Sequence, residues 1–364
     1  MKIIFRSLSA LFIINILSVV LMMTLISPNS GGVIAATTRD KRLTDQDVIL
    51  VDIRTGVTLS LLDNFSDEEV MGRTPVWSHN GEYVSFWMFP NRQDRFAYEF
   101  DLTNAELHNL TENQDYFSLP IYGANNQRLF ASFPTFNNVA LYLVTETNAE
   151  SEIIINSVTR LPAWSPDGRY IAYLAIPSQD DSGETIDSGS GNFQPDILVM
   201  DVETGDIRNY TAGTNTIGVP VWSPDGSQII FVSILVNFGQ IYSIDIETGT
   251  ITEFPTRTRA VDRPTWSPDG RYLAFTSNHE QYSRAPDVEV VILDMETYEL
   301  RNISNSPLYD TEPTWSPDSR QLAFVSRRLR AQDEIYIANV STGALRRLTY
   351  TDYLDESDIS WRPR

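Results

Sequence analysis

One phrase returns along most of this 364-residue chain at intervals of about 45 residues: Pro-x-Trp-Ser-Pro-Asp-Gly, followed by an apolar triplet. Six of the seven tryptophans belong to copies of this phrase, and a tyrosine takes the place of tryptophan in one degenerate copy. The aromatic positions of the repeat are Trp77, Tyr122, Trp164, Trp222, Trp266, Trp315 and Trp361. A period of this size, built from short strands, is typical of a β-propeller.

The phrase itself predicts a tight hairpin. Pro sets φ at the first central position of a turn, Asp tolerates the second, and Gly adopts the left-handed conformation that follows. A second phrase, Asp-x-x-Thr-Gly as in 201–205, recurs between the copies and predicts another hairpin. Two hairpins give the four antiparallel strands of one blade, here called A to D. We therefore expect the tryptophans to be wedges between blades and the first-turn aspartates to stabilise their turns, namely Asp167, Asp225, Asp269 and Asp318.

The number of blades depends on how the chain ends. Seven C-D hairpins can be counted but only six complete A-B hairpins, because the chain stops three residues after Trp361. We expect an all-β fold, a β-propeller of seven four-stranded antiparallel blades, closed when Ile359–Trp361 joins the N-terminal strands Val48–Asp52 and Val57–Leu62. Thr37–Leu43 is the candidate for the remaining strand of that blade. A six-bladed propeller with an extra flap is the alternative.

The N-terminal segment has the pattern of an export signal. Basic residues precede an apolar run, Leu8–Ile26, and small residues follow at Val33–Ala36. The run is also about long enough to span a bilayer. Residues 1–36 are therefore predicted to be a signal peptide or an N-terminal membrane anchor, and residues 37–364 a single propeller domain. We expect the domain outside the cytoplasm, in the periplasm or at the cell surface.

The charge of the chain limits its partners. The formal net charge is −21, and it falls to −23 without Lys2 and Arg6 of the N-terminal segment. Such a chain is a poor partner for nucleic acid, and it suits a basic protein or a cation, although solubility alone also explains the charge. The three histidines form no metal-binding motif, so no transition-metal site and no cofactor are expected.

Charged residues gather just before the predicted A strands, where we expect the mouth of the propeller channel. Converging carboxylates there would suit a basic peptide segment or Ca²⁺. The alternatives are solvated loop charges or a carboxylate pair that acts as acid and base. The candidate binding residues are Asp115, Arg160, Asp262, Arg263, Asp310, Glu312, Asp355 and Asp358.

The longest form of the repeat carries a family resemblance. Trp164-Ser-Pro-Asp-Gly-Arg-Tyr-Ile-Ala-Tyr and Trp266-Ser-Pro-Asp-Gly-Arg-Tyr-Leu-Ala-Phe resemble the WD40-like (PD40) repeat of the TolB family, and the resemblance spans roughly residues 46 to 364. It implies a rigid propeller that recognises proteins through its channel mouth. TolB-family proteins of the Tol-Pal system also carry an N-terminal α/β domain. The few residues before the first blade cannot supply that domain, so the Tol-Pal role is not carried over.

These observations favour a non-catalytic protein-binding module or scaffold in the cell envelope. We expect a monomeric domain with a protein or peptide partner, and membrane contact only through the N-terminal segment. The alternative is a propeller enzyme, a hydrolase or lyase that acts on extracellular carbohydrate or peptide through the channel-mouth carboxylates. The Gly-x-Ser-x-Gly elbow of α/β-hydrolases is absent from the sequence.

Overall fold

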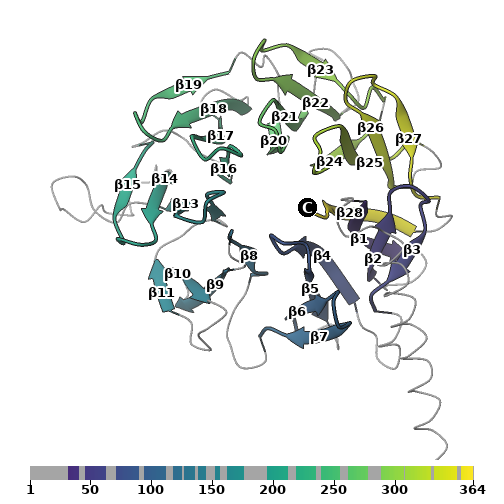
Figure 1. Ribbon diagram of the computed structural model, residues 1–364, viewed down its shortest axis with the longest axis horizontal. Coiled ribbons are helices and arrows are strands. Elements are labelled where there is room, and N and C mark those ends of the chain that lie inside the picture. Colours follow the sequence, from purple (N-terminus) through teal and green to yellow (C-terminus); the bar gives the residue numbers. More distant parts are fainter. Residues whose placement is uncertain are drawn as a thin grey trace, which may run out of the picture. The chain divides into compact units, whose positions relative to one another are not determined.

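The described part of the chain consists of strands and the turns that join them (Figure 1). The computed structural model describes residues 32–363, apart from 41–45, 63–70, 90–93, 112–117, 125–126, 136–137, 145–151, 156–161, 176–194, 212–218, 235–238, 255–260, 278–287, 307, 329–331 and 351–353. Within these ranges there is no helix, and so none that could cross a membrane. The strands form seven four-stranded antiparallel sheets. These are the seven blades of a β-propeller, as the repeat predicts.

The chain divides into two compact units, and residues 1–114 with 314–364 make up the first. One of its blades has the order β28-β1-β2-β3, and the others run β4 to β7 and β24 to β27, with β24 beginning just outside the unit. The strands are β1 (Val33–Asp40), β2 (Gln46–Asp52), β3 (Thr58–Ser60), β4 (Met71–Trp77), β5 (Tyr83–Phe89), β6 (Phe96–Asp101), β7 (Glu106–Asn109), β24 (Asp310–Trp315), β25 (Gln321–Ser326), β26 (Glu334–Asn339), β27 (Leu345–Arg347) and β28 (Leu354–Trp361).

The second unit, residues 115–313, holds four blades whose strands follow chain order. These strands are β8 (Ile121–Tyr122), β9 (Arg128–Thr135), β10 (Asn138–Val144), β11 (Glu152–Ile155), β12 (Ala163–Trp164), β13 (Tyr170–Ala175), β14 (Asp196–Asp201), β15 (Ile207–Asn209), β16 (Val221–Trp222), β17 (Gln228–Ile234), β18 (Gly239–Asp245), β19 (Ile251–Glu253), β20 (Val261–Trp266), β21 (Tyr272–Ser277), β22 (Glu289–Asp294) and β23 (Leu300–Asn302).

The A-B turns have one hydrogen-bond pattern in every well-formed repeat. In the turn at 165–170, the Ser165 hydroxyl donates to Asp167 Oδ1 at 2.6 Å, and the same carboxylate accepts the N–H of Arg169 at 3.0 Å. The hydroxyl oxygen of Ser165 also accepts the N–H of Tyr170 at 2.8 Å. The turn is therefore closed by its own side chains. The same Ser-to-Asp hydrogen bond recurs at Asp225, Asp269 and Asp318.

The first blade joins the two ends of the described chain. β1 pairs with β2 on one side and with β28 on the other, so the N- and C-terminal strands close this blade as expected. The strand assigned from sequence to Thr37–Leu43 begins four residues earlier, at Val33. The predicted domain boundary at residue 36 therefore falls inside β1, and most of the predicted leader lies outside the described residues.

The blade cores are built on both faces of the inner strands, whose residues are buried almost without interruption. On β21, for example, Leu273 and Phe275 are fully buried, and they belong to one cluster with Val291 on β22 and Ile230 on β17 of the preceding blade. Edge strands such as β15 and β19 are exposed along their whole length. Burial is greatest in the B and C strands, which have a partner strand on each side.

Candidate functional site

The structure places six of the predicted binding residues in pairs at the beginnings of three A strands. Asp262 and Arg263 lie on β20, Asp310 and Glu312 on β24, and Asp355 and Asp358 on β28. Asp115 and Arg160 lie outside the described residues. We call the part of each A strand that precedes its tryptophan the A-strand entry.

Three of the A-strand entries share an unusual backbone. Thr74, Glu312 and Asp358 each lie three residues before the tryptophan of their blade and have φ of 56°, 58° and 50°. The left-handed conformation costs about 1–2 kcal/mol for a residue other than glycine. On β4 the pairing register shifts between Arg73 and Val76, and such β-bulges redirect side chains, often beside functional sites. Glu312 and Asp358 are half-buried.

Other carboxylates of these blades are fully buried. Asp310 and Glu356 each lie five residues before a tryptophan and have no exposed surface. Their backbone N–H groups donate to the carbonyl oxygens of Val288 (2.8 Å) and Asp333 (3.0 Å) of the preceding blades. Asp310 is thus part of the packed interior, in contrast to Glu312. Within the described ranges, His, Asp and Glu side chains nowhere form a group of three or more that could hold a metal ion. Ca²⁺ binding stays a prediction.

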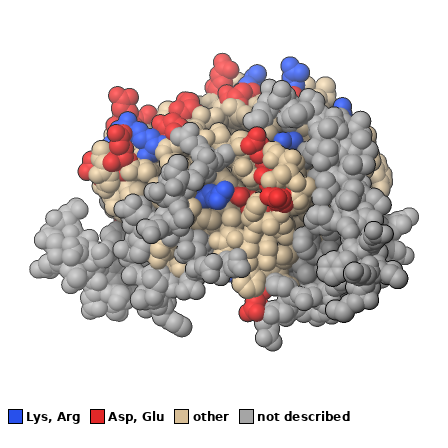
Figure 2. Space-filling view, turned by 60° about the horizontal axis from the view of Figure 1, so that its bottom comes forward, with Lys and Arg blue, Asp and Glu red and all other residues tan. Residues whose placement is uncertain are grey.

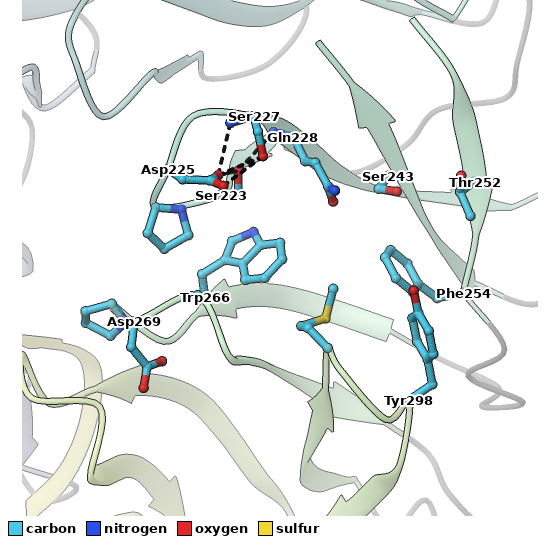
Figure 3. Close-up of a pocket in the computed structure, with 14 residues that line it drawn as sticks. Ser223, Asp225, Ser227, Gln228, Ser243, Thr252, Phe254, Trp266, Asp269 and Tyr298 are labelled. Atoms are coloured by element: carbon cyan, nitrogen blue, oxygen red, sulfur yellow. Dashed lines mark hydrogen bonds between the residues drawn. The ribbon is translucent and has the colours of Figure 1, made fainter. Parts of the chain in front are cut away.

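A different site opens between the blade β16–β19 and the blade β20–β23, which lie in the same unit. It is a cavity of about 530 Å³ at the end of the blades where the hairpin turns lie (Figure 3). Figure 3 shows Trp266, Phe254 and Tyr298 on one side of it, and Ser227, Gln228, Ser243 and Thr252 on the other. The volume is within the range of small-molecule sites.

Trp266 differs from the other repeat tryptophans. The indole N–H of Trp77 donates to the carbonyl oxygen of Ser360 at 3.0 Å, and Trp164 and Trp222 make the corresponding bond to the preceding blade at 3.0 and 3.1 Å. The Nε1 atom of Trp266 is buried, yet it finds no hydrogen-bond partner among the described residues. Its side chain is also more exposed than the five other repeat tryptophans, which are at most 8% exposed.

We call the boundary between the blades β16–β19 and β20–β23 the seam. The A-B turns explain why it is open. A Cβ added to Gly168 would lie 3.3 Å from Ala124, and one added to Gly226 would lie 3.7 Å from Pro166, because each turn leans on the turn of the preceding blade. A Cβ on Gly270 would meet no atom within 4 Å. The turn that follows Trp266 therefore stands away from its neighbour.

Tyr298 is the second unusual residue of the cavity. It occupies the last position of the C-D turn phrase, where four other blades have a glycine with φ between 69° and 76°. Tyr298 has φ of 59°, so a bulky residue is held in the left-handed conformation. Its ring lies 5.9 Å from that of Phe254, at an angle of 42°. Backbone strain of this kind is frequent at ligand sites.

The polar side of the cavity includes an ionised carboxylate. The hydrogen bond from Ser223 is the main cause that lowers the pKa of Asp225 below its ordinary value, and the N–H of Ser227 adds to it. Asp269 lies at the facing turn. A neighbouring cavity of about 650 Å³ is lined instead by an ion pair, in which Arg169 lies 2.9 Å from Asp201.

Comparison with known proteins places the repeat in a family. The family model for the TolB beta propeller domain, PD40, matches residues 162–285 and 264–364, which together exceed half of the chain. The chain belongs to the TolB β-propeller family. Its relatives of known sequence include the uncharacterized peptidase YuxL of Bacillus subtilis, 31% identical over 83 residues, or 23% of this chain and 10% of that protein. This TolB-family propeller thus aligns with about a tenth of that relative's length.

Solved structures share the fold of this TolB-family propeller. TolB from Acinetobacter baumannii has a TM-score of 0.54 at 19% identity, covering 92% of this chain and 68% of its own. The oligogalacturonate lyase from Vibrio parahaemolyticus has a TM-score of 0.60 at 13% identity, covering 88% and 86%. The propeller domain of the Trilobed protease from Pyrococcus furiosus has a TM-score of 0.64 at 12% identity, covering 89% and 96%. At these identities the likeness concerns the fold alone.

Sequence reasoning did not single out this cavity. The repeat predicts that Trp266 is a wedge like the other tryptophans, and its local sequence, Pro-Thr-Trp-Ser-Pro-Asp, is the same as that around Trp315. One unusual feature of the cavity can be found in the sequence: Tyr298 stands where the Asp-x-x-Thr-Gly phrase has its turn glycine.

Proposed function

We propose that this TolB-family propeller is a non-catalytic binding module that works outside the cytoplasm, in the cell envelope. It recognises a protein partner with its A-strand entries. The observation that supports this most directly is the repeated left-handed residue at Thr74, Glu312 and Asp358. At Thr74 and Asp358 this conformation coincides with shifts in the pairing register of β4 and β28, and such β-bulges often lie beside functional sites. The same conformation occurs at two half-buried carboxylates, Glu312 on β24 and Asp358 on β28.

The charge of the chain indicates the kind of partner. The formal net charge is −21, and Figure 2 shows acidic side chains spread more widely than basic ones over the described surface on the face in view. Acidic surfaces speed encounter with basic partners and disfavour acidic ones. The partner surface is therefore basic. The envelope location rests on the export pattern of the N-terminal sequence.

The test is recovery of partners from envelope extract with two variants of the full chain. The double variant Glu312→Gln, Asp358→Asn removes both carboxylates, and each amide has nearly the shape of the residue that it replaces. Asparagine is also well tolerated at the positive φ of position 358. The control, Glu203→Gln with Glu247→Gln, removes the same charge from exposed C-D turns at the other end of the strands. We expect a basic partner to be retained by the control and lost with the entry variant. Equal retention by both variants would overturn the proposal.

A further inference from the structure

We propose that the cavity between the blades β16–β19 and β20–β23 is a binding site for a neutral saccharide. The site is separate from the A-strand entries, because its lining comes from the hairpin turns at the other end of the strands. Three independent features define it: the seam is open at Gly270, Trp266 is left with an unused donor, and Tyr298 is held in a strained backbone.

The apolar side of the cavity suits the face of a sugar ring. A pyranose presents C–H groups on its faces and hydroxyl groups around its edge. Trp266 and Tyr298 supply broad apolar rings, and Tyr298 is 50% exposed, so its ring is accessible from solvent. Phe254 is only 3% exposed and packs against the Tyr298 ring. Aromatic side chains gain much from covering an apolar surface while a polar atom at their edge stays available for hydrogen bonding.

The polar side suits sugar hydroxyls. The indole N–H of Trp266 can only donate, so it requires an acceptor oxygen, whereas the carboxylate of Asp225 can only accept. A sugar hydroxyl does both, and a single saccharide can satisfy the two groups together. Ser243 and Thr252 offer further hydroxyls on the same side.

Charge excludes acidic sugars from the site. Asp225 and Asp269 both line the cavity, in a chain whose formal charge is −21. A uronate would bring a like charge beside them, which opposes binding. A proline-rich peptide is the main competitor, since such segments dock on aromatic grooves and present carbonyl acceptors. It is less suitable, because prolines have no N–H to donate to the carboxylates.

The experiment observes the unused donor directly. The full chain, labelled with ¹⁵N-tryptophan, is titrated with cellotriose, maltotriose, chitotriose, trigalacturonate and a proline-rich decapeptide. The variant Trp266→Phe identifies the Nε1–H resonance of Trp266 by its disappearance. We expect a downfield shift of that resonance with at least one neutral trisaccharide, as the N–H gains an acceptor, and no shift with trigalacturonate.

A matched pair of variants separates binding from stability. Tyr298→Gly restores the residue that other blades have at this position, so we expect an unchanged or higher unfolding midpoint and at least tenfold weaker saccharide binding. Ala105→Gly relieves the same conformation, φ 59°, in the corresponding turn of the blade β4–β7, and Ala105 is not among the residues that line the cavity. It should leave binding unchanged. The proposal is overturned if no neutral trisaccharide moves the resonance at millimolar concentration, if the decapeptide alone moves it, or if Tyr298→Gly binds as tightly as the unchanged chain.

Discussion

Single residues carry much of the geometry of the turns, and the C-D turn glycines show how the surroundings change their role. Gly56 has φ of 72° and Gly343 has φ of 69°, so both need the left-handed conformation equally. Their neighbours differ. A Cβ on Gly56 would lie 2.6 Å from the carbonyl oxygen of Leu348, whereas a Cβ on Gly343 would meet nothing within 4 Å.

We therefore expect Gly56→Ala to destabilise the protein more than Gly343→Ala. The second substitution costs the backbone strain alone, about 1–2 kcal/mol. The first also forces a clash with a backbone oxygen, which cannot move without shifting the end of β27. Denaturant unfolding of the two variants would measure the difference in the free energy of unfolding. Equal losses would mean that the close approach to Leu348 relaxes freely.

At the scale of the element, the A-B hairpin is stabilised by a carboxylate whose charge matters. The hydrogen bond from Ser165 is the main cause that lowers the pKa of Asp167. Asn80 occupies the same position in the first copy and accepts the corresponding bond from Ser78 at 2.7 Å. The turn therefore forms with an amide oxygen in place of a carboxylate oxygen. Replacing Asp167 with asparagine should thus test the effect of the charge with little change in the turn.

The substitution Asp167→Asn should reduce the dependence of stability on acid pH. Because the pKa of Asp167 is lower in the folded state than the value of about 3.9 in an unfolded chain, its ionised form stabilises the fold above that pH. That stabilisation is lost as the pH falls from about 4 through the folded-state pKa. The unchanged chain should thus lose more unfolding free energy than the variant between pH 6 and pH 3. Parallel losses in denaturant titrations at the two pH values would contradict this.

For the whole molecule, the repeat predicts most of the architecture and little of the candidate site. The turns are local, so Ser165 and Asp167 are recognisable without knowing what packs around them. The open seam at Trp266 arises from packing between blades, which identical local sequences at Trp266 and Trp315 do not encode. Val33–Ala36 are small enough for a cleavage site and apolar enough for a buried strand, and sequence alone favoured the former.

Closure of the first blade leads to a prediction about processing. Val33, Ile34, Ala35 and Ala36 have no exposed surface, and Ile34 is the residue of β1 that pairs with Trp361 of β28. The N–H of Arg362 donates to the carbonyl oxygen of Val33 at 2.9 Å. Burial of Val33 and Ile34 alone contributes on the order of 3–6 kcal/mol. Cleavage after Ala36 would remove these contacts and leave part of β28 without its partner strand.

We therefore expect a chain that begins at Gly32 to have a clearly higher thermal midpoint than a chain that begins at Thr37. N-terminal sequencing of the protein purified from cells should give a first residue no later than Val33, whether a leader is removed upstream or retained. A matched control is a chain that begins at Gly32 with Arg39→Ala, since Arg39 lies on the same strand but is exposed. That substitution should change the midpoint little. A mature protein that begins at Thr37 and unfolds at the same temperature as the longer chain would show that the blade closes without the first half of β1.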